Sequence, residues 1–204
     1  MKHLTVTLVI VFLFLSLIPI AYIKSPGFIL DIVIFALLPI FYYYTREQWN
    51  LKTPVFTFLM LGPLTHSLGI FGWYGSSPLP ISWDHITHFF GLFPLAMLFT
   101  FWAAQFMDKK ISSRKNLILL IMVFLAASGV GAVIELAEFI GYLKLGFGEG
   151  GFRFGPGDGA EGTQLIKDIG GGWINTGWDL VYNTLGVVFG IIVSLFFILK
   201  KSAD

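Results

Sequence analysis

Long apolar stretches separated by short polar segments occupy almost the whole chain. Each stretch approaches or exceeds the ~20 residues that a helix needs to cross ~30 Å of hydrocarbon. This pattern predicts an all-α fold, namely a polytopic membrane protein with a bundle of six transmembrane helices in a single domain, residues 1–204. The predicted spans are residues 4–23, 28–44, 54–74, 85–106, 117–143 and 178–199.

The first apolar stretch follows Lys2, as the apolar part of a secretory signal would. Its apolar core is long for such a signal, and Tyr22-Ile23-Lys24 is a poor cleavage context. We therefore expect this stretch to be retained as the first span, with a cleaved leader as the alternative.

Composition supports a membrane protein. Hydrophobic residues make up 56% of the chain and charged residues 12%, against about 25% charged in an average soluble domain. Lipid can surround such a surface, so the lipid bilayer is the expected partner. The net charge of +1, without a basic patch, argues against nucleic acid. The absence of cysteine excludes disulfides, thiolate metal sites and cysteine nucleophiles.

Basic residues predict the orientation of the spans. Lys24, Lys144, Arg153 and Lys167 fall on one predicted side of the membrane, and the other nine Lys and Arg residues fall on the side of the two termini. The positive-inside rule therefore predicts that both termini are cytoplasmic. On the opposite side, residues 145–177 form a predicted Gly-rich outer loop. This loop has no GK[ST] ending, so a phosphate-binding P-loop is not supported.

Three predicted spans each have two polar residues one helical turn apart, in or directly beside the span and near the same predicted outer surface: Asp84 and His88, Glu135 and Glu138, and Asp179 and Asn183. Residues at this spacing share one face of a helix. His66 lies about 12 Å below Tyr74 at ~1.5 Å per helical residue, and is the deepest polar candidate. We expect these groups to meet in one pocket beneath the outer surface.

Charged groups inside a membrane are costly, at roughly 2.5–3.5 kcal/mol each at the centre on insertion scales. They must pair, bind a cation, take up protons or face water. Imidazole and carboxylate together can hold zinc, manganese or iron, so a divalent metal ion is the candidate cofactor. The candidate site comprises His66, Asp84, His88, Glu135, Glu138, Asp179 and Asn183, and its candidate metal ligands are His66, His88, Glu135, Glu138 and Asp179.

Structural roles are the alternative for each residue. Asp84 and Asp179 stand where they could cap the start of their helices, and His66 could serve packing alone. Asp31 stands alone in its span and His85 faces away from the Asp84–His88 edge, so both are assigned structural roles.

Four motifs, within residues 60–190, resemble a known pattern: His66-x-x-Gly69, Asp84-x-x-x-His88-Phe89, Glu135-x-x-Glu138 and Trp178-Asp179-x-x-x-Asn183-x-x-Gly186. Their order is similar to that of the YjdF-type predicted inner-membrane proteins, and the last three also resemble the VanZ-like pattern. VanZ-like sequences usually carry Gln in place of Glu138, and the YjdF-type pattern tends to have an acid near Asn175. The resemblance implies a prokaryotic inner-membrane protein and does not define a reaction.

Three functions remain open at this point. The first is an outward-facing site that binds a metal or a lipid or glycolipid head group, with hydrolysis as one chemistry that it could support. The second is a proton- or cation-coupled transporter, and the third is a non-catalytic envelope protein whose polar cluster fixes helix packing. The sequence defines neither the substrate, the metal, the oligomeric state nor whether the protein is an enzyme.

Overall fold

Helices form the whole of the regular structure in the computed structural model, which describes residues 2–51, 53–145 and 171–203. No strand occurs in these three ranges. In chain order the elements are α1 (Lys2–Lys24), η1 (Pro26–Phe28), α2 (Ile29–Thr45), α3 (Thr53–Leu59), α4 (Leu61–Ser67), η2 (Leu68–Phe71), α5 (Trp83–Ala103), η3 (Ala104–Phe106), α6 (Arg114–Leu145) and α8 (Gly171–Ala203).

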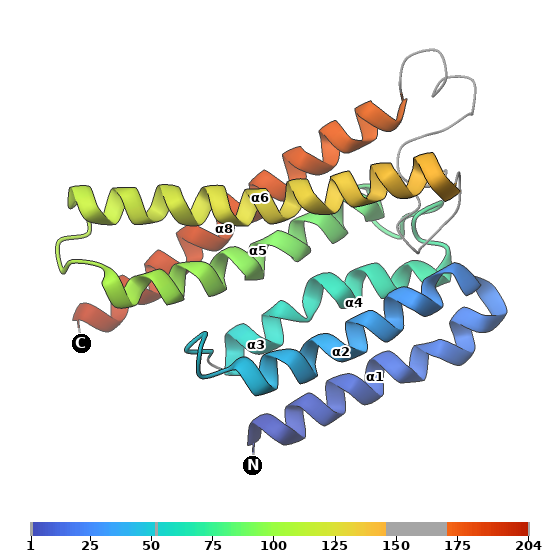
Figure 1. The fold of residues 1–204 in the computed structure, drawn as a ribbon, viewed down its shortest axis with the longest axis horizontal. Coiled ribbons are helices and arrows are strands. Elements are labelled where there is room, and N and C mark those ends of the chain that lie inside the picture. The colour runs from blue at the N-terminus through green and yellow to red at the C-terminus, as the bar shows by residue number, and fades with distance from the viewer. Residues whose placement is uncertain (1, 52, 146–170, 204) are drawn as a thin grey trace.

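Six helical segments of the described chain are long and apolar enough to cross a membrane. The predicted all-α membrane bundle is therefore confirmed. Figure 1 shows both termini toward one end of the bundle, here called the terminal end, and the α1–α2 and α4–α5 connections at the other, here called the distal end. The segments are His3–Lys24, Pro26–Thr45, Thr53–Phe71, Trp83–Phe106, Arg114–Gly141 and Asn175–Lys200.

The predicted outer loop, residues 145–177, lies mostly outside the described residues, which omit 146–170. Its last part is helical, because α8 begins at Gly171 and not at residue 178. Asn175 in this extra segment donates a hydrogen bond from Nδ2 to Asp84 Oδ2 at 3.2 Å. This contact anchors the first turns of α8 to the start of α5.

The third span is divided into α3, α4 and η2. Pro63 lies in the first turn of α4, and its ring nitrogen has no hydrogen to donate to the carbonyl of Leu59. The regular α-helix is therefore interrupted at Met60, whose N–H donates to Thr57 O at 3.2 Å in a tighter turn.

The helices pack in two groups that share α5. On one side, α1 to α4 enclose an apolar core that includes Phe14, Phe28, Ile32 and Phe56. On the other, α6 and α8 lie along α5 (Figure 1). A smaller apolar core joins these three helices through Leu92, Ala96, Ala127 and Val187.

Glycines allow α8 to lie directly against the backbone of α5. A Cβ atom added at Gly186 would stand 2.5 Å from the carbonyl oxygen of Phe89, and one added at Gly190 would overlap the carbonyl oxygen of Phe93. Small residues at such positions let membrane helices approach closely. This approach places Asp179, seven residues before Gly186, beside the first turns of α5.

We predict that Gly190→Ala lowers the free energy of unfolding by about 1–3 kcal/mol, the usual cost of overpacking. The added methyl would meet the Phe93 carbonyl oxygen and would stand 2.9 Å from Ala96 Cβ. Unfolding of the purified protein in detergent measures the effect. Gly129→Ala is the matched control, because a Cβ there meets nothing within 4 Å. Equal stability of the two variants would contradict the proposed backbone contact.

Candidate metal centre

Two of the predicted polar pairs lie inside their helices and do not cap them. Asp84 is the second residue of α5, and the N-cap position belongs to Ser82. Asp179 is the ninth residue of α8, which begins at Gly171. The capping interpretation is therefore wrong for both carboxylates, and a different reason is needed for their position in an apolar bundle.

His88 is the centre of a buried cluster to which α5, α6 and α8 each contribute a carboxylate. Its Nε2 lies 3.3 Å from Asp84 Oδ1 and 3.7 Å from Asp179 Oδ1. Its Nδ1 lies 3.1 Å from Glu135 Oε1. All four side chains are at most 8% exposed. The imidazole therefore separates two acids at one ring nitrogen from one acid at the other.

Two amides support the carboxylates. Asn183 donates from Nδ2 to Glu135 Oε1 at 3.1 Å, and Asn175 donates to Asp84 Oδ2 at 3.2 Å. Asn183 was among the predicted residues, whereas Asn175 was not. The signal for Asn175 is its spacing, since residues 175, 179 and 183 follow one another at four-residue intervals on one face of α8.

Several oxygens of the cluster are buried without a hydrogen-bond partner within the described part of the chain. They are both carboxylate oxygens of Asp179, Oε2 of Glu135 and Oδ1 of Asn183. Over the same residues, the only ion pairs of Asp84, Glu135 and Asp179 are with His88. Three carboxylates against one imidazole leave negative charge uncompensated, which is costly away from water. The cluster therefore needs a cation or protons.

The ligand atoms are close enough for one metal ion to join them. Asp84, His88 and Asp179 form one set, and His88, Glu135 and Glu138 form another, with the atoms of each set within 4.8 Å of one another. Imidazole nitrogen and carboxylate oxygen suit zinc, manganese and iron. Glu138 differs from the others because it is only partly buried. It therefore stands at the more open side of the cluster.

His66 lies in a separate set of contacts and is not among the residues that surround His88. Its Nε2 lies 3.2 Å from Asp31 Oδ2, and its Nδ1 lies 2.7 Å from the Tyr74 hydroxyl. The rings of Phe28 and Phe35 are each 5.4 Å from the imidazole, centre to centre. Both ring nitrogens of His66 thus have partners. His66 does not join the pocket around His88, contrary to the prediction.

The sequence analysis left Asp31 out of the candidate site, and the structure pairs it with His66. It lies in the first turn of α2 and is 5% exposed. Since α2 begins at the distal end, where the third span finishes with η2, Asp31 and His66 reach the same depth on neighbouring helices. A comparison of the depths of Asp31 and His66 in their predicted spans could have indicated this pair from the sequence. His85, in contrast, stacks on Tyr182 at 4.2 Å between ring centres, away from the cluster as expected.

Trp83 connects the two polar sets. Its indole Nε1 donates to the carbonyl oxygen of Thr65 at 2.9 Å. Trp83 directly precedes Asp84 in α5, and Thr65 directly precedes His66 in α4. A hydrogen bond between neighbours of Asp84 and His66 therefore fixes the start of α5 against α4.

An all-α bundle with six membrane-length helices and a buried polar cluster defines a membrane protein with several spans. The chain belongs to a family described as predicted membrane protein (DUF2238), whose family model matches residues 2–201. No curated protein and no solved structure matches the chain. The family match supports the membrane assignment and leaves the YjdF-type and VanZ-like resemblance as a prediction.

We predict that Tyr74→Phe lowers the free energy of unfolding by about 1–2 kcal/mol, because the half-buried His66 Nδ1 loses its 2.7 Å partner. Chemical unfolding in detergent measures this change. Tyr44→Phe is the control, because Tyr44 is 75% exposed. If both substitutions had the same small effect, the hydrogen bond to His66 would not contribute to stability.

Proposed function

We propose that this protein binds a divalent metal ion in the buried cluster, with His88 Nε2, Asp84 and Asp179 as ligands. The observation that carries this proposal is Asp179. Its two carboxylate oxygens are buried and have no hydrogen-bond partner within the described chain. One ligand atom from each of the three residues lies within 4.8 Å of the others. A metal between them would satisfy oxygens that the surrounding side chains leave unpaired.

The contacts on the other side of the imidazole support the same choice. Glu135 Oε1, 3.1 Å from His88 Nδ1, is positioned to accept the Nδ1–H. In that tautomer the lone pair of Nε2 faces the carboxylates of Asp84 and Asp179. A cation bound between these groups would remove the repulsion between the lone pair and the two negative charges. Metal-bound histidines commonly donate their other N–H to a carboxylate in this way. Asn183, which donates to the same Glu135 oxygen, holds that carboxylate in place.

Charge balance also favours a divalent ion. With a neutral His88, the carboxylates of Asp84, Glu135 and Asp179 would carry three negative charges in a region at most 8% exposed. A divalent cation reduces this to one. Uncompensated buried charge is strongly destabilising, so this is a large effect for a bundle surrounded by lipid.

The position of the cluster near the distal end supports a second bound group, a lipid head group from the membrane surface. Asp84 lies in the first turn of α5, at the distal end, and Glu138 is partly exposed beside His88 and Glu135. We infer that a polar lipid or lipid-linked head group reaches this side. A metal held here can activate a bound water near neutral pH, which supports hydrolysis as the chemistry.

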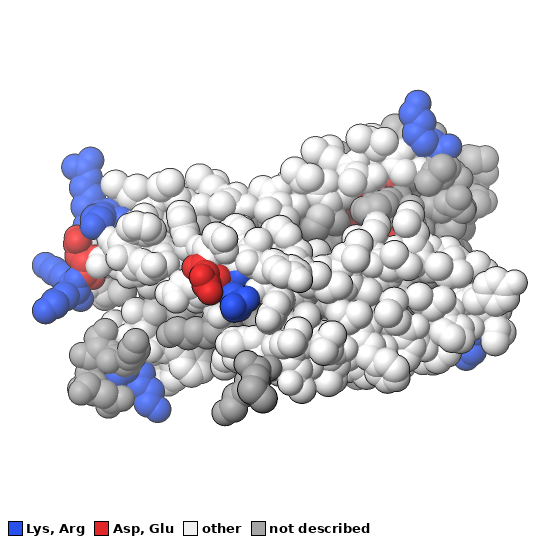
Figure 2. All heavy atoms as spheres, turned by 60° about the horizontal axis from the view of Figure 1, so that its bottom comes forward, with Lys and Arg blue, Asp and Glu red and all other residues white. Residues whose placement is uncertain are grey.

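We infer the orientation of the bundle in the membrane from the distribution of its basic residues. Nine of the thirteen basic residues belong to segments predicted to lie on the side of the two termini, and Figure 2 shows most of the visible Lys and Arg atoms toward one end of the molecule. The positive-inside rule supports cytoplasmic termini and a site on the outer side of a prokaryotic inner membrane. The order of the motifs supports the YjdF-type resemblance, with which this localisation agrees.

Purified protein is expected to hold about one divalent ion per chain, measured by elemental analysis after removal of loosely bound metal. Asp179→Asn and His88→Phe should each weaken binding at least tenfold, about 1.4 kcal/mol, because each removes a ligand. The metal should raise the unfolding temperature of the unmodified protein and not that of Asp179→Asn, since only a bound ion stabilises the folded state.

His85→Ala is the matched control, because it removes an imidazole on α5 that stacks on Tyr182 and lies outside the ligand sets. It should retain full metal content. Equal metal in all variants would identify adventitious binding and contradict the proposal. Absence of metal in every preparation, with only lower stability in the variants, would assign the cluster to helix packing.

Cation transport is the second candidate, and two hydroxyls favour it. Ser128 Oγ on α6 and Ser194 Oγ on α8 are buried without a partner in the described chain. Ser194 lies about 16 Å beyond Asn183 along α8, toward the terminal end, at ~1.5 Å per residue. Uptake of Mn²⁺ or Zn²⁺ into proteoliposomes, slowed by Ser194→Ala at unchanged metal content, would assign the cluster to transport. Absence of uptake would leave the static metal centre.

A further inference from the structure

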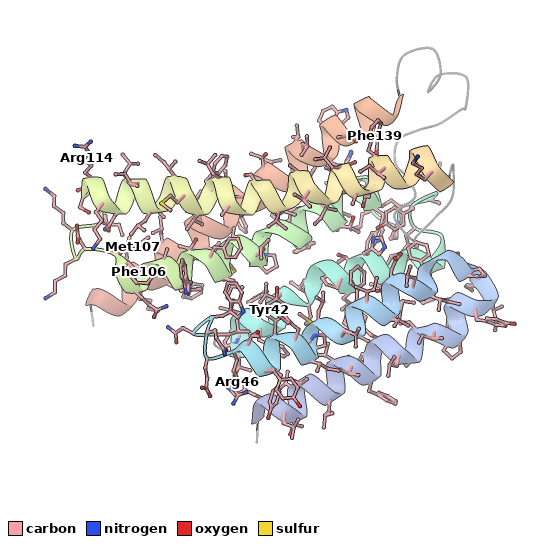
Figure 3. The ribbon with its side chains drawn as sticks, viewed as in Figure 1. Tyr42, Arg46, Phe106, Met107, Arg114 and Phe139 are labelled. Atoms are coloured by element: carbon pink, nitrogen blue, oxygen red, sulfur yellow. The ribbon has the colours of Figure 1, made fainter. Side chains whose placement is uncertain are left out.

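Two acidic groups beside His88 remain unused in the proposed metal centre. They are the carboxylate of Glu138 and the second carboxylate oxygen of Glu135, Oε2. The two glutamates lie three positions apart on α6 and so share one face of that helix. Figure 3 labels Phe139, which directly follows Glu138, on the distal half of α6. One ligand atom from each of His88, Glu135 and Glu138 lies within 4.8 Å of the others.

Glu135 uses one of its carboxylate oxygens and leaves the other without a partner. Its Oε1 lies 3.1 Å from His88 Nδ1 and accepts a hydrogen bond from Asn183 Nδ2 at 3.1 Å. Its Oε2 is buried and has no hydrogen-bond partner within the described chain. The side chain is only 3% exposed, and a carboxylate oxygen removed from water is costly unless it is paired. Oε2 therefore needs a ligand that the neighbouring side chains do not supply.

Glu138 offers a second carboxylate on the same side of the imidazole. None of the ion pairs within the described chain includes it. Its side chain is partly buried, whereas Glu135 is buried. The Glu138 carboxylate thus lies between the closed part of the cluster and its more open side. An ion held by both glutamates can therefore keep bound water.

Charge balance leaves a place for a second divalent ion. The cluster holds four carboxylates, on Asp84, Asp179, Glu135 and Glu138, and beside a neutral imidazole they carry four negative charges. The ion proposed between the two aspartates neutralises two of these charges, and a second ion at the two glutamates would neutralise the others. This balance rests on the proposed metal centre, whereas the unpaired oxygen of Glu135 does not depend on it.

The ligand set indicates which ion. His88 supplies no free nitrogen on this side, because its Nδ1 faces Glu135 Oε1 and its Nε2 faces the two aspartates. Only carboxylate oxygen and water remain. Magnesium is commonly bound by one or two carboxylates and keeps several waters, and manganese accepts the same oxygen ligands. Zinc suits the first centre better, because imidazole nitrogen is available there.

We propose that Glu135 and Glu138 form a second site for a hydrated divalent cation of the magnesium and manganese type, on the Nδ1 side of His88. Glu135 binds this ion through Oε2, while its Oε1 continues to accept from His88 and Asn183. Glu138 binds it from the more open side. The waters of the ion face the side from which the lipid head group of the proposed function approaches.

The test uses the purified full chain, freed of metal, loaded with one equivalent of Zn²⁺ and then titrated with Mn²⁺. Electron paramagnetic resonance of free Mn²⁺ gives the bound amount, and about one Mn²⁺ per chain is expected in addition to the zinc. Glu138→Gln should weaken Mn²⁺ binding at least tenfold, about 1.4 kcal/mol, because a charged ligand is lost. It should retain the zinc, whose ligands are unchanged, and this retention shows that the variant is folded.

The water ligands give a separate readout. Bound Mn²⁺ should accelerate the relaxation of water protons, because it keeps waters that exchange with the solvent. Mg²⁺ at millimolar concentration should displace the Mn²⁺ and leave the zinc in place. Bound Mn²⁺ without exchangeable water, or Mn²⁺ that Mg²⁺ does not displace, would contradict the proposed hydrated site.

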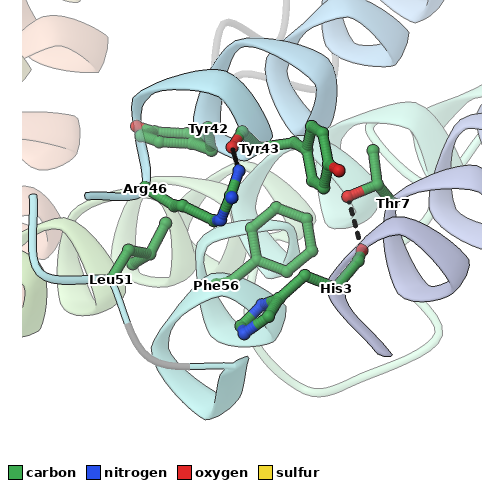
Figure 4. A pocket seen from close by; sticks show the side chains of 7 residues that line it. All are labelled: His3, Thr7, Tyr42, Tyr43, Arg46, Leu51 and Phe56. Atoms are coloured by element: carbon green, nitrogen blue, oxygen red, sulfur yellow. Dashed lines mark hydrogen bonds between the residues drawn. The ribbon is translucent and has the colours of Figure 1, made fainter. Parts of the chain in front are cut away.

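Glu47→Gln is the matched control, because it makes the same substitution at the terminal end of the bundle. The Glu47 side chain is 85% exposed, and its Oε1 lies 3.5 Å from Arg46 Nη2. Arg46 keeps its hydrogen bond from Nη1 to the carbonyl oxygen of Tyr43, at 2.6 Å, without it (Figure 4). Glu47→Gln should therefore bind both ions as the unmodified chain does.

The outcomes separate this site from the metal centre. Mn²⁺ binding that is lost in Glu138→Gln and kept in Asp179→Asn, in a chain that holds no zinc, would retain the second site and remove the first. Zinc bound as expected, with equal Mn²⁺ binding in the unmodified chain and Glu138→Gln, would retain the first site and overturn the second. Loss of zinc in Glu138→Gln, or equal losses of Mn²⁺ in Glu138→Gln and Glu47→Gln, would overturn the second site as well.

Discussion

The close contact between α5 and α8 is the constraint on which the rest of the polar architecture depends. Without side chains at Gly186 and Gly190, the α8 backbone lies against the carbonyls of Phe89 and Phe93. At this separation even short aspartate side chains from the two helices reach the same imidazole, so that Asp84 and Asp179 face one nitrogen of His88. A wider separation would leave each carboxylate alone in an apolar bundle, where the cost of a charge is highest.

The two polar sets differ in how completely their hydrogen bonds are satisfied. His66 is engaged at both ring nitrogens, by Asp31 and by Tyr74, and is enclosed by aromatic rings. The set around His88 keeps buried oxygens without partners in the described chain, above all on Asp179. A satisfied network specifies packing, whereas the unpaired oxygens of the other set are the basis of the proposed cation site. This difference is why function is assigned to the second set alone.

Hydropathy was sufficient to predict the six spans, and residue spacing predicted that Asp84, His88, Glu135, Asp179 and Asn183 share one height. Neither gives the rotation of a helix about its axis or the identity of its neighbours. His66 has the expected depth but faces α2, where Asp31 meets it. The capping interpretation failed for a related reason, since α8 begins at Gly171, well before the apolar stretch that marks its span. Asn175, which holds Asp84, lies in that polar first part of the helix, and the sequence indicated its position only through the YjdF-type pattern, not as a member of the candidate site.

The hydrogen bond from Trp83 to Thr65 has a mechanical consequence. It joins the residue before Asp84 to the residue before His66, across the boundary between the two groups of helices. Because packed interiors transmit displacement rather than absorb it, the first turn of α5 and the end of α4 must shift together. Any event that draws Asp84 toward Asp179 would therefore also displace the His66 imidazole, which Phe28 and Phe35 contact. This holds although, within the described chain, the ion pairs around His88 do not include His66.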